Sequence, residues 1–164
     1  MRGEVFGSEC LAEVLGPEWA GPPRGVPIRR RDVPFDLTGA AFFAAVVATV
    51  LPWTRFGGAS GLFGAWGLSP FQWSSVSALG AAAGLLLWLG LRVAGRTGGR
   101  SGGFVLLALA AATATGSILH AYNPPPFTHA WLGPWVALGS AAVAGGTSAW
   151  LLTRAGMAAR ADTA

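Results

Sequence analysis

Residues 75–93 read SVSALGAAAGLLLWLGLRV, an apolar run whose single charged residue, Arg92, stands next to its end. The hydrocarbon core of a bilayer is about 30 Å thick, so a helix that rises about 1.5 Å per residue needs roughly 20 mostly apolar residues to cross it. The run has this length and this composition. It therefore predicts a transmembrane helix.

Three further apolar runs, none of which contains a charged residue, lie on either side of this one. They cover residues 37–53, 103–122 and 133–153. Hydrophobic residues make up 52% of the chain and charged residues 11%, a balance that is unusual for a soluble domain. The sequence thus predicts an all-α, polytopic membrane protein in which four transmembrane helices form an antiparallel bundle.

The rest of the chain is organised around these runs. Residues 1–34 form the expected N-terminal tail, with a short helix over residues 4–15 and a Pro/Gly-rich linker, residues 35–154 the transmembrane domain, and residues 155–164 a second tail. Asp36 is the expected N-cap of the first helix, which should end at Pro52 and Trp53. A cleaved signal peptide would need a short basic leader, whereas 36 residues precede the first run.

Arginine placement sets the expected orientation. Arginines precede the first run, separate the second from the third and follow the fourth, at Arg24, Arg29, Arg30, Arg31, Arg92, Arg96, Arg100, Arg154 and Arg160. Arg55 alone falls in the other set of loops. Basic residues accumulate on the cytoplasmic side of membrane proteins. We therefore expect a multi-pass protein of the cell (inner) membrane with both termini in the cytoplasm.

Small residues four positions apart predict where the helices approach one another, because association in lipid depends on close packing and interhelical hydrogen bonds. The pairs are Gly80 and Gly84, Ala112 and Gly116, Ala141 and Gly145, and Ala142 and Gly146. Four hydroxyl side chains are placed to bond across helices or back to their own carbonyls, namely Ser77, Thr113, Ser117 and Thr147. A dedicated homodimer face is the alternative use of the small residues.

Patterns typical of catalysis or metal binding are sparse. Cys10 is the sole cysteine, which excludes an intramolecular disulfide and a CxxC pair. His120 and His129 are the only histidines, too few ligands for a metal or haem site without a nearby carboxylate or cysteine. We expect them to be interfacial residues with access to solvent. The apolar runs carry no carboxylate, which argues against a proton-coupled transporter.

Aromatic residues concentrate on the expected outer side. The loop over residues 54–74 holds both glycines and large apolar residues, so we expect it to fold back as a hydrophobic cap over the helix ends. The loop over residues 123–132 is stiffened by three prolines. An aromatic belt is the simpler interpretation of this distribution, and a recognition surface is the alternative. The candidate surface comprises Trp53, Phe63, Trp66, Phe71, Trp73, Tyr122, Trp131 and Trp135.

Three features of the sequence resemble a known group of proteins. They are Leu51-Pro52-Trp53 at the end of the first run, the Gly/Trp-rich loop after it, and the segment LGPWVALG at residues 132–139. With these features, residues 36–154 resemble small four-helix membrane proteins of actinobacteria, including those called tryptophan-associated membrane proteins. A lysine-free composition rich in alanine, glycine and arginine agrees with a bacterial GC-rich genome. The resemblance implies an architecture and no activity.

The expected function is non-enzymatic: an integral inner-membrane accessory or scaffold protein that acts through helix packing and its outer surface. The alternative is a transport or lipid-handling component that binds a hydrophobic ligand at the outer aromatic face. An enzyme or haem protein that uses His120 and His129 is the weakest of the three. The expected partners are the lipid bilayer and either another membrane protein or further copies of the chain, with no nucleic acid and no cofactor.

Overall fold

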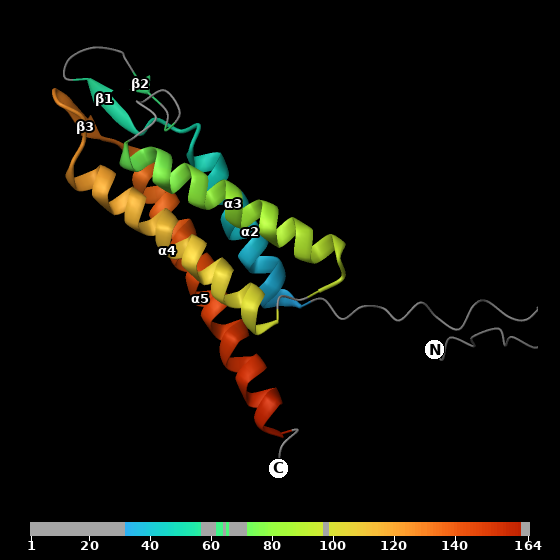
Figure 1. Cartoon of the computed structure of the whole chain (residues 1–164). Coiled ribbons are helices and arrows are strands. Elements are labelled where there is room, and N and C mark those ends of the chain that lie inside the picture. The colour runs from blue at the N-terminus through green and yellow to red at the C-terminus, as the bar shows by residue number, and fades with distance from the viewer. Residues whose placement is uncertain (1–31, 57–61, 64, 66–71, 97–98, 162–164) are drawn as a thin grey trace, which may run out of the picture. The chain divides into compact units, whose positions relative to one another are not determined.

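The computed structural model describes residues 32–56, 62–63, 65, 72–96 and 99–161, all within one compact unit that begins at Asp32. The expected helix over residues 4–15 and the linker after it lie outside this part of the chain. The described part contains four helices and a small sheet at one end of them (Figure 1). The helices are α2 (Val33–Ala48), α3 (Trp73–Val93), α4 (Arg100–Tyr122) and α5 (Leu132–Ala161).

Three of the four helices are long and apolar enough to cross a membrane. They are Trp73–Val93, Arg100–Tyr122 and the part of α5 from Leu132 to Met157. The fourth, α2, is also apolar but has 16 residues, which corresponds to about 24 Å of helix. The prediction of four helices is confirmed, while α2 is shorter than a full span.

The bounds predicted for the first helix are wrong at both ends. Its N-cap is Asp32, not Asp36, and no side chain caps it; Pro34 occupies the first turn, where the missing N–H is no loss. Its last residue is Ala48. The next residues tighten into turns, in which Leu51 N–H donates to the Ala48 carbonyl at 3.2 Å. Pro52 explains this end, because it has no N–H to donate to the Ala48 carbonyl four residues earlier and its ring would clash with that carbonyl in a continued helix.

Each helix packs against two neighbours that run in the opposite direction. On α3 and α4, residue numbers rise on one helix as they fall on the other: Ser77 bonds Ser117 at 2.9 Å, and Gly102 lies against Leu91. The same holds for α2 with α3, where Gly39 faces Trp88 and Gly84 faces Phe42. The remaining neighbour pairs are α4 with α5 and α2 with α5.

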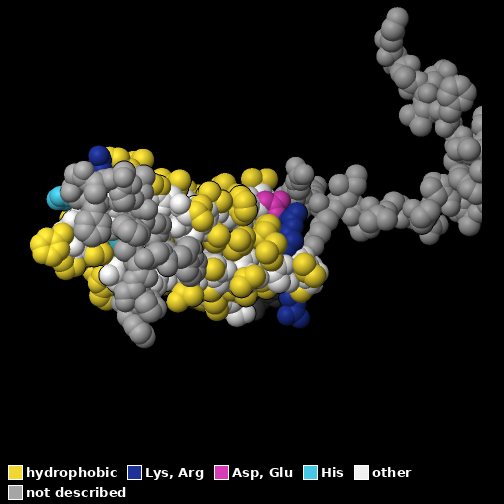
Figure 2. All heavy atoms as spheres, turned by 90° about the horizontal axis from the view of Figure 1, so that it is seen from above, with side chains coloured by type: hydrophobic (Ala, Val, Ile, Leu, Met, Phe, Trp, Pro, Cys, Tyr) yellow, Lys and Arg dark blue, Asp and Glu magenta, His cyan; other side chains and the backbone are white. Residues whose placement is uncertain are grey.

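Small and hydroxyl side chains turn inward together with a few large apolar ones, such as Phe35, Phe42 and Leu106, whereas many other large apolar side chains turn outward. Buried hydroxyls join helices: Thr38 bonds Thr147 across α2 and α5 at 2.7 Å, and Ser77 bonds Ser117. The exposed set includes Leu79, Leu86, Phe104, Val105, Val143 and Trp150. In Figure 2 the visible face between the two ends is dominated by hydrophobic side chains, while charged ones lie toward the ends.

A three-stranded antiparallel sheet lies at one end of the helices, which we call the strand end. Its order is β2 (Leu62–Phe63), β1 (Thr54–Phe56) and β3 (Thr128–Ala130), and Thr54 pairs with Ala130. Backbone bonds tie the turn after α2 to neighbouring segments: Gly133 N–H donates to the Pro52 carbonyl at 2.9 Å, and Ala65 N–H to the Thr49 carbonyl at 3.0 Å. No strand was predicted in these loops.

The small-residue pairs differ in what they pack against. A Cβ at Gly80 would lie 2.8 Å from Thr113 Oγ1 on α4, whereas one at Gly84 would lie 2.2 Å from the Phe42 ring on α2. The missing side chains of the two glycines therefore allow two different helices, α4 and α2, to approach α3 closely. Gly116 lies directly against the backbone of α3, since its Cβ would lie 2.5 Å from the Ser77 backbone nitrogen.

On α5 only one of the two overlapping pairs faces another helix. Ala141 is buried and Gly145 faces Ala110 on α4. Ala142 is exposed, and nothing lies within 4 Å of a Cβ at Gly146, so these two do not pack against another described helix of this chain, and the alternative of a homodimer face stays a prediction. On α4, Ala112 is half-buried beside its buried partner Gly116.

Candidate functional site

Trp53 is the largest fully buried side chain among the described residues, and it organises the strand end. Its indole Nε1 donates to the Ala48 carbonyl at 2.8 Å, which satisfies the C-terminal end of α2. Its ring lies in a notch at the start of α5, where a Cβ at Gly133 would be 2.2 Å from Cδ1. Trp53 is 0% exposed. It therefore belongs to the core and not to the recognition surface in which the sequence placed it.

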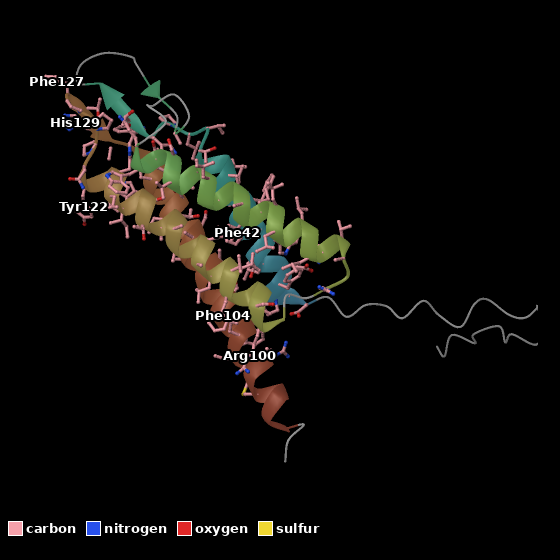
Figure 3. All side chains as sticks on the ribbon, viewed as in Figure 1. Phe42, Arg100, Phe104, Tyr122, Phe127 and His129 are labelled. Atoms are coloured by element: carbon pink, nitrogen blue, oxygen red, sulfur yellow. The ribbon has the colours of Figure 1, made fainter. Side chains whose placement is uncertain are left out.

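His120 packs edge-on against Trp53, with 5.3 Å between the ring centroids. It is 1% exposed, so the prediction of a solvent-accessible interfacial histidine is wrong. The ring hydrogen-bonds the backbone of Trp53, while Nε2 has no partner among the described residues. His129 is exposed on β3 (Figure 3). Within the described ranges no three His, Cys, Asp or Glu side chains gather as a metal site would need.

Four aromatic residues of the predicted surface do lie exposed at the strand end. Trp73 begins α3, Tyr122 ends α4, and Trp131 and Trp135 flank the start of α5. The Arg55 guanidinium stacks over the Trp131 ring at 5.1 Å. Figure 3 shows Tyr122 and Phe127 directed away from the helices. The tryptophan and tyrosine side chains have the amphipathic character of interfacial anchors.

The predicted hydrophobic cap falls mostly outside the described residues. Trp66 and Phe71 lie there, and Phe63 is described only by its backbone, which pairs with Thr54. Ala65 is buried and joins the apolar cluster around Trp53 and Ala137. The described part of the loop thus contacts the strand end, and the cap itself stays a prediction.

A groove at the opposite end, which we call the arginine end, was not predicted. It runs between α2 and α3 with a volume of about 550 Å³. Its lining is apolar except for one acidic and one basic residue, and consists of Asp36, Gly39, Ala40, Phe43, Leu85, Trp88, Leu89 and Arg92. Arg92 was the one charge noted inside an apolar run. The sequence predicts a helix cap for the acidic residue, Asp36, and therefore gives no reason to pair it with Arg92.

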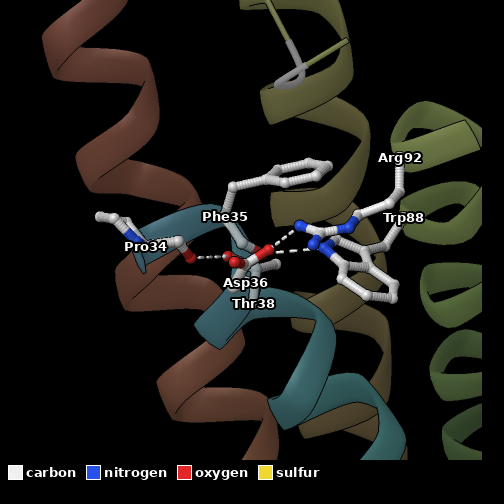
Figure 4. Close-up of polar contacts among 6 residues, drawn as sticks. All are labelled: Pro34, Phe35, Asp36, Thr38, Trp88 and Arg92. Carbon is white, nitrogen blue, oxygen red and sulfur yellow. Dashed lines mark hydrogen bonds and ion pairs between the residues drawn. The ribbon is translucent and has the colours of Figure 1, made fainter. Parts of the chain in front are cut away.

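The groove is fixed by polar contacts that Figure 4 draws. Trp88 Nε1 donates to the Phe35 carbonyl at 2.8 Å, and the two rings lie 5.9 Å apart. Arg92 Nη1 donates to Asp36 Oδ1 in an ion pair, while the guanidinium stacks over the Trp88 ring at 5.7 Å. Asp36 is 29% exposed and Arg92 48%. One anion and one cation therefore stand side by side at the mouth of an apolar groove.

A second groove, also of about 550 Å³, lies between α4 and α5 at the arginine end. Arg100 and Phe104 line it from α4, as do Leu152 and Met157 from α5 (Figure 3 labels the first two). It has a cation and no described carboxylate in its lining. The two grooves thus differ in charge.

No protein-family model matches the chain, and neither the curated proteins nor the solved structures compared with it include a similar one. The resemblance to tryptophan-associated membrane proteins therefore stays a prediction.

Proposed function

We propose that this chain is a multi-pass membrane protein whose four helices form an antiparallel bundle across a bilayer, and that it acts as a non-catalytic accessory or scaffold protein. The single observation that carries the proposal is the outward display of large apolar side chains over helices that bond hydroxyls within. A soluble protein would lose the hydrophobic free energy of those side chains to water, whereas lipid accepts them at no cost.

The short α2 helix is compatible with this arrangement. Backbone that leaves a helix at membrane depth must be buried in protein and hydrogen-bonded. After Ala48, Thr49 and Trp53 are buried, and the Thr49, Pro52 and Trp53 carbonyls accept bonds from Ala65, Gly133 and Trp131. In this arrangement, a non-helical segment with hydrogen-bonded carbonyls completes the first passage through the membrane.

The charge distribution supports the orientation with the arginine end in the cytoplasm. Arg92, Arg96, Arg100 and Arg154 belong to the arginine end, and Arg55 to the strand end. Basic residues favour the cytoplasmic side. The exposed tryptophans of the strand end then sit at the outer interface, where indole rings are favoured.

Cysteine accessibility in intact cells tests this proposal. In a Cys10→Ser background, Gly99→Cys places a thiol in the α3–α4 turn, where nothing lies within 4 Å of the new Cβ, and His129→Cys places one at the exposed middle residue of strand β3. A membrane-impermeant maleimide should label His129→Cys in intact cells and Gly99→Cys only after permeabilisation. Labelling of both in intact cells, or recovery of the protein in the soluble fraction, would contradict the proposal.

The scaffold role has its own test. Purification in mild detergent should yield a membrane-protein partner whose recovery depends on the exposed tryptophans of the strand end. Trp135→Ala should reduce that recovery, whereas Trp150→Ala, which removes a similarly exposed indole further along α5, should not. A hydrophobic ligand that follows the same pattern would favour the lipid-handling alternative instead.

A further inference from the structure

We infer that the groove between α2 and α3 binds one ethanolamine phospholipid from the cytoplasmic leaflet. An acyl chain would lie along the apolar lining, and the zwitterionic head group would meet the Asp36–Arg92 pair. The inference rests on the proposed membrane location, because only there is lipid the surrounding solvent. It adds a specific ligand class to that proposal.

The groove has the size and the surface that a lipid tail needs. Its volume of about 550 Å³ lies within the roughly 300–1,000 Å³ of small-molecule sites. The small side chain of Ala40 leaves its α2 side without bulk, next to Gly39, whose notch holds the Trp88 ring, while Phe43 and Leu89 stand exposed beside them. An alkyl chain seated there gains dispersion contacts with the lining.

The groove is already formed without a ligand. Trp88 forms part of its lining and cannot move toward α2, because its ring fills the notch left by Gly39, where a Cβ would lie 2.1 Å from Cε2. Its hydrogen bond to Phe35 fixes the remaining rotation of the indole. A preformed site avoids the entropic cost of ordering side chains on binding.

The charges at the groove mouth select the head group. A guanidinium has five donors and a carboxylate about four acceptor sites, so one mutual bond leaves both free to bind more. Arg92 is placed to bind the phosphate, and Asp36 the primary ammonium of ethanolamine. Phosphatidylglycerol offers no ammonium and would set its phosphate beside Asp36. Phosphatidylcholine has a quaternary ammonium, which cannot donate a hydrogen bond to the carboxylate.

Native mass spectrometry of the full chain tests the inference. The protein is released from detergent with equal amounts of phosphatidylethanolamine, phosphatidylglycerol and phosphatidylcholine. We expect one phosphatidylethanolamine to be retained at least fivefold more than either competitor. Asp36→Asn removes the carboxylate and keeps Arg92, so it should lower that preference at least fivefold and shift binding toward phosphatidylglycerol.

A filled groove provides the second variant. Ala40→Phe places a ring in the groove and should abolish retention of the lipid. Ala142→Phe adds the same ring to an exposed alanine of α5 and should leave retention unchanged. Unchanged retention in Ala40→Phe, equal retention of the three lipids, or a dimer that replaces the lipid in the spectra would overturn the inference. Cysteine labelling that supports the topology alongside such a result would show that this inference alone has failed.

Discussion

Two tryptophans hold the two ends of α2, and they differ in what surrounds them. Trp53 donates to the Ala48 carbonyl at the last turn of the helix, and Trp88 to the Phe35 carbonyl at the first turn, both at 2.8 Å. Each ring occupies a notch left by a glycine, Gly133 for Trp53 and Gly39 for Trp88. The anchoring chemistry is therefore the same at both ends.

The surroundings decide what each end can do. Trp53 is covered on all sides, packs on His120 and leaves no surface. Trp88 is half-buried and forms part of the lining of an open groove next to an exposed ion pair. The Trp53 indole is part of the closed core. The Trp88 indole packs between two helices and also lines a proposed binding surface. We expect the strand end to tolerate change poorly and the arginine end to tolerate it better.

Trp53→Ala should have the largest effect on stability. It removes a fully buried indole and the hydrogen bond to Ala48, which corresponds to a loss of about 3–5 kcal/mol. Unfolding in mixed micelles by sodium dodecyl sulfate, followed by circular dichroism, measures the change. Trp53→Phe keeps most of the packing and should lose only about 1–2 kcal/mol. Equal losses for Trp53→Ala and Trp88→Ala would break the contrast between the two ends.

The glycine notches give the second test. Gly133→Ala should lower the free energy of unfolding by an amount near the upper limit of about 1–3 kcal/mol, because the Trp53 ring is enclosed and cannot move away from the new methyl group. Gly39→Ala should cost about 1 kcal/mol less, since the Trp88 ring is only half-buried and has the open groove on one side, so fewer neighbouring groups must give way. Gly146→Ala, where the new Cβ meets nothing within 4 Å, should be neutral or stabilising. The same unfolding assay compares the three, and a smaller loss for Gly133→Ala than for Gly39→Ala would contradict this account.

The elements that the sequence predicted well are those set by local composition. The runs at 75–93 and 103–122 correspond to helices Trp73–Val93 and Arg100–Tyr122, because apolar length alone indicates such a helix. The fourth run begins one residue after Leu132, but α5 continues to Ala161, past the last apolar residues of the predicted span. The length of an apolar run could not show that the helix continues past Arg154 and Arg160.

The elements that the sequence missed depend on contacts between distant residues. The strands have two or three residues each and pair Thr54 with Ala130, too short for an alternating pattern to appear. Ala141 and Ala142 each begin a small-residue pair, and their directions differ by about 100° around the helix. Only the position of α4 decides which pair is buried. The sequence likewise predicted an interfacial position for Trp53, because the burial of this side chain depends on Gly133, which lies 80 positions further along the chain.

Trp88→Ala is expected to cost about 2 kcal/mol, roughly half the effect of Trp53→Ala. The indole is half-buried, so less packing is lost, and its hydrogen bond to Phe35 accounts for part of the change. The variant should also lose retention of phosphatidylethanolamine while the unfolding assay still shows a cooperative transition. A loss of stability without any change in lipid retention would assign Trp88 to packing alone.

Asp36→Asn should have the smallest effect on stability, no more than about 1 kcal/mol. The pair with Arg92 is partly exposed, and such pairs contribute little because solvent screens the charges and holding the side chains costs entropy. Asparagine keeps the shape of the side chain and a hydrogen-bond acceptor for Arg92. The variant therefore separates the two roles of the arginine end: unfolding should be nearly unchanged, while the preference for phosphatidylethanolamine falls. Val47→Leu on the same helix serves as the control, because Val47 is exposed and lies outside the groove lining, so this change should alter neither measurement. A loss above about 2 kcal/mol in Asp36→Asn would mean that the ion pair holds α2 against α3, and the arginine end would then be as structural as the strand end.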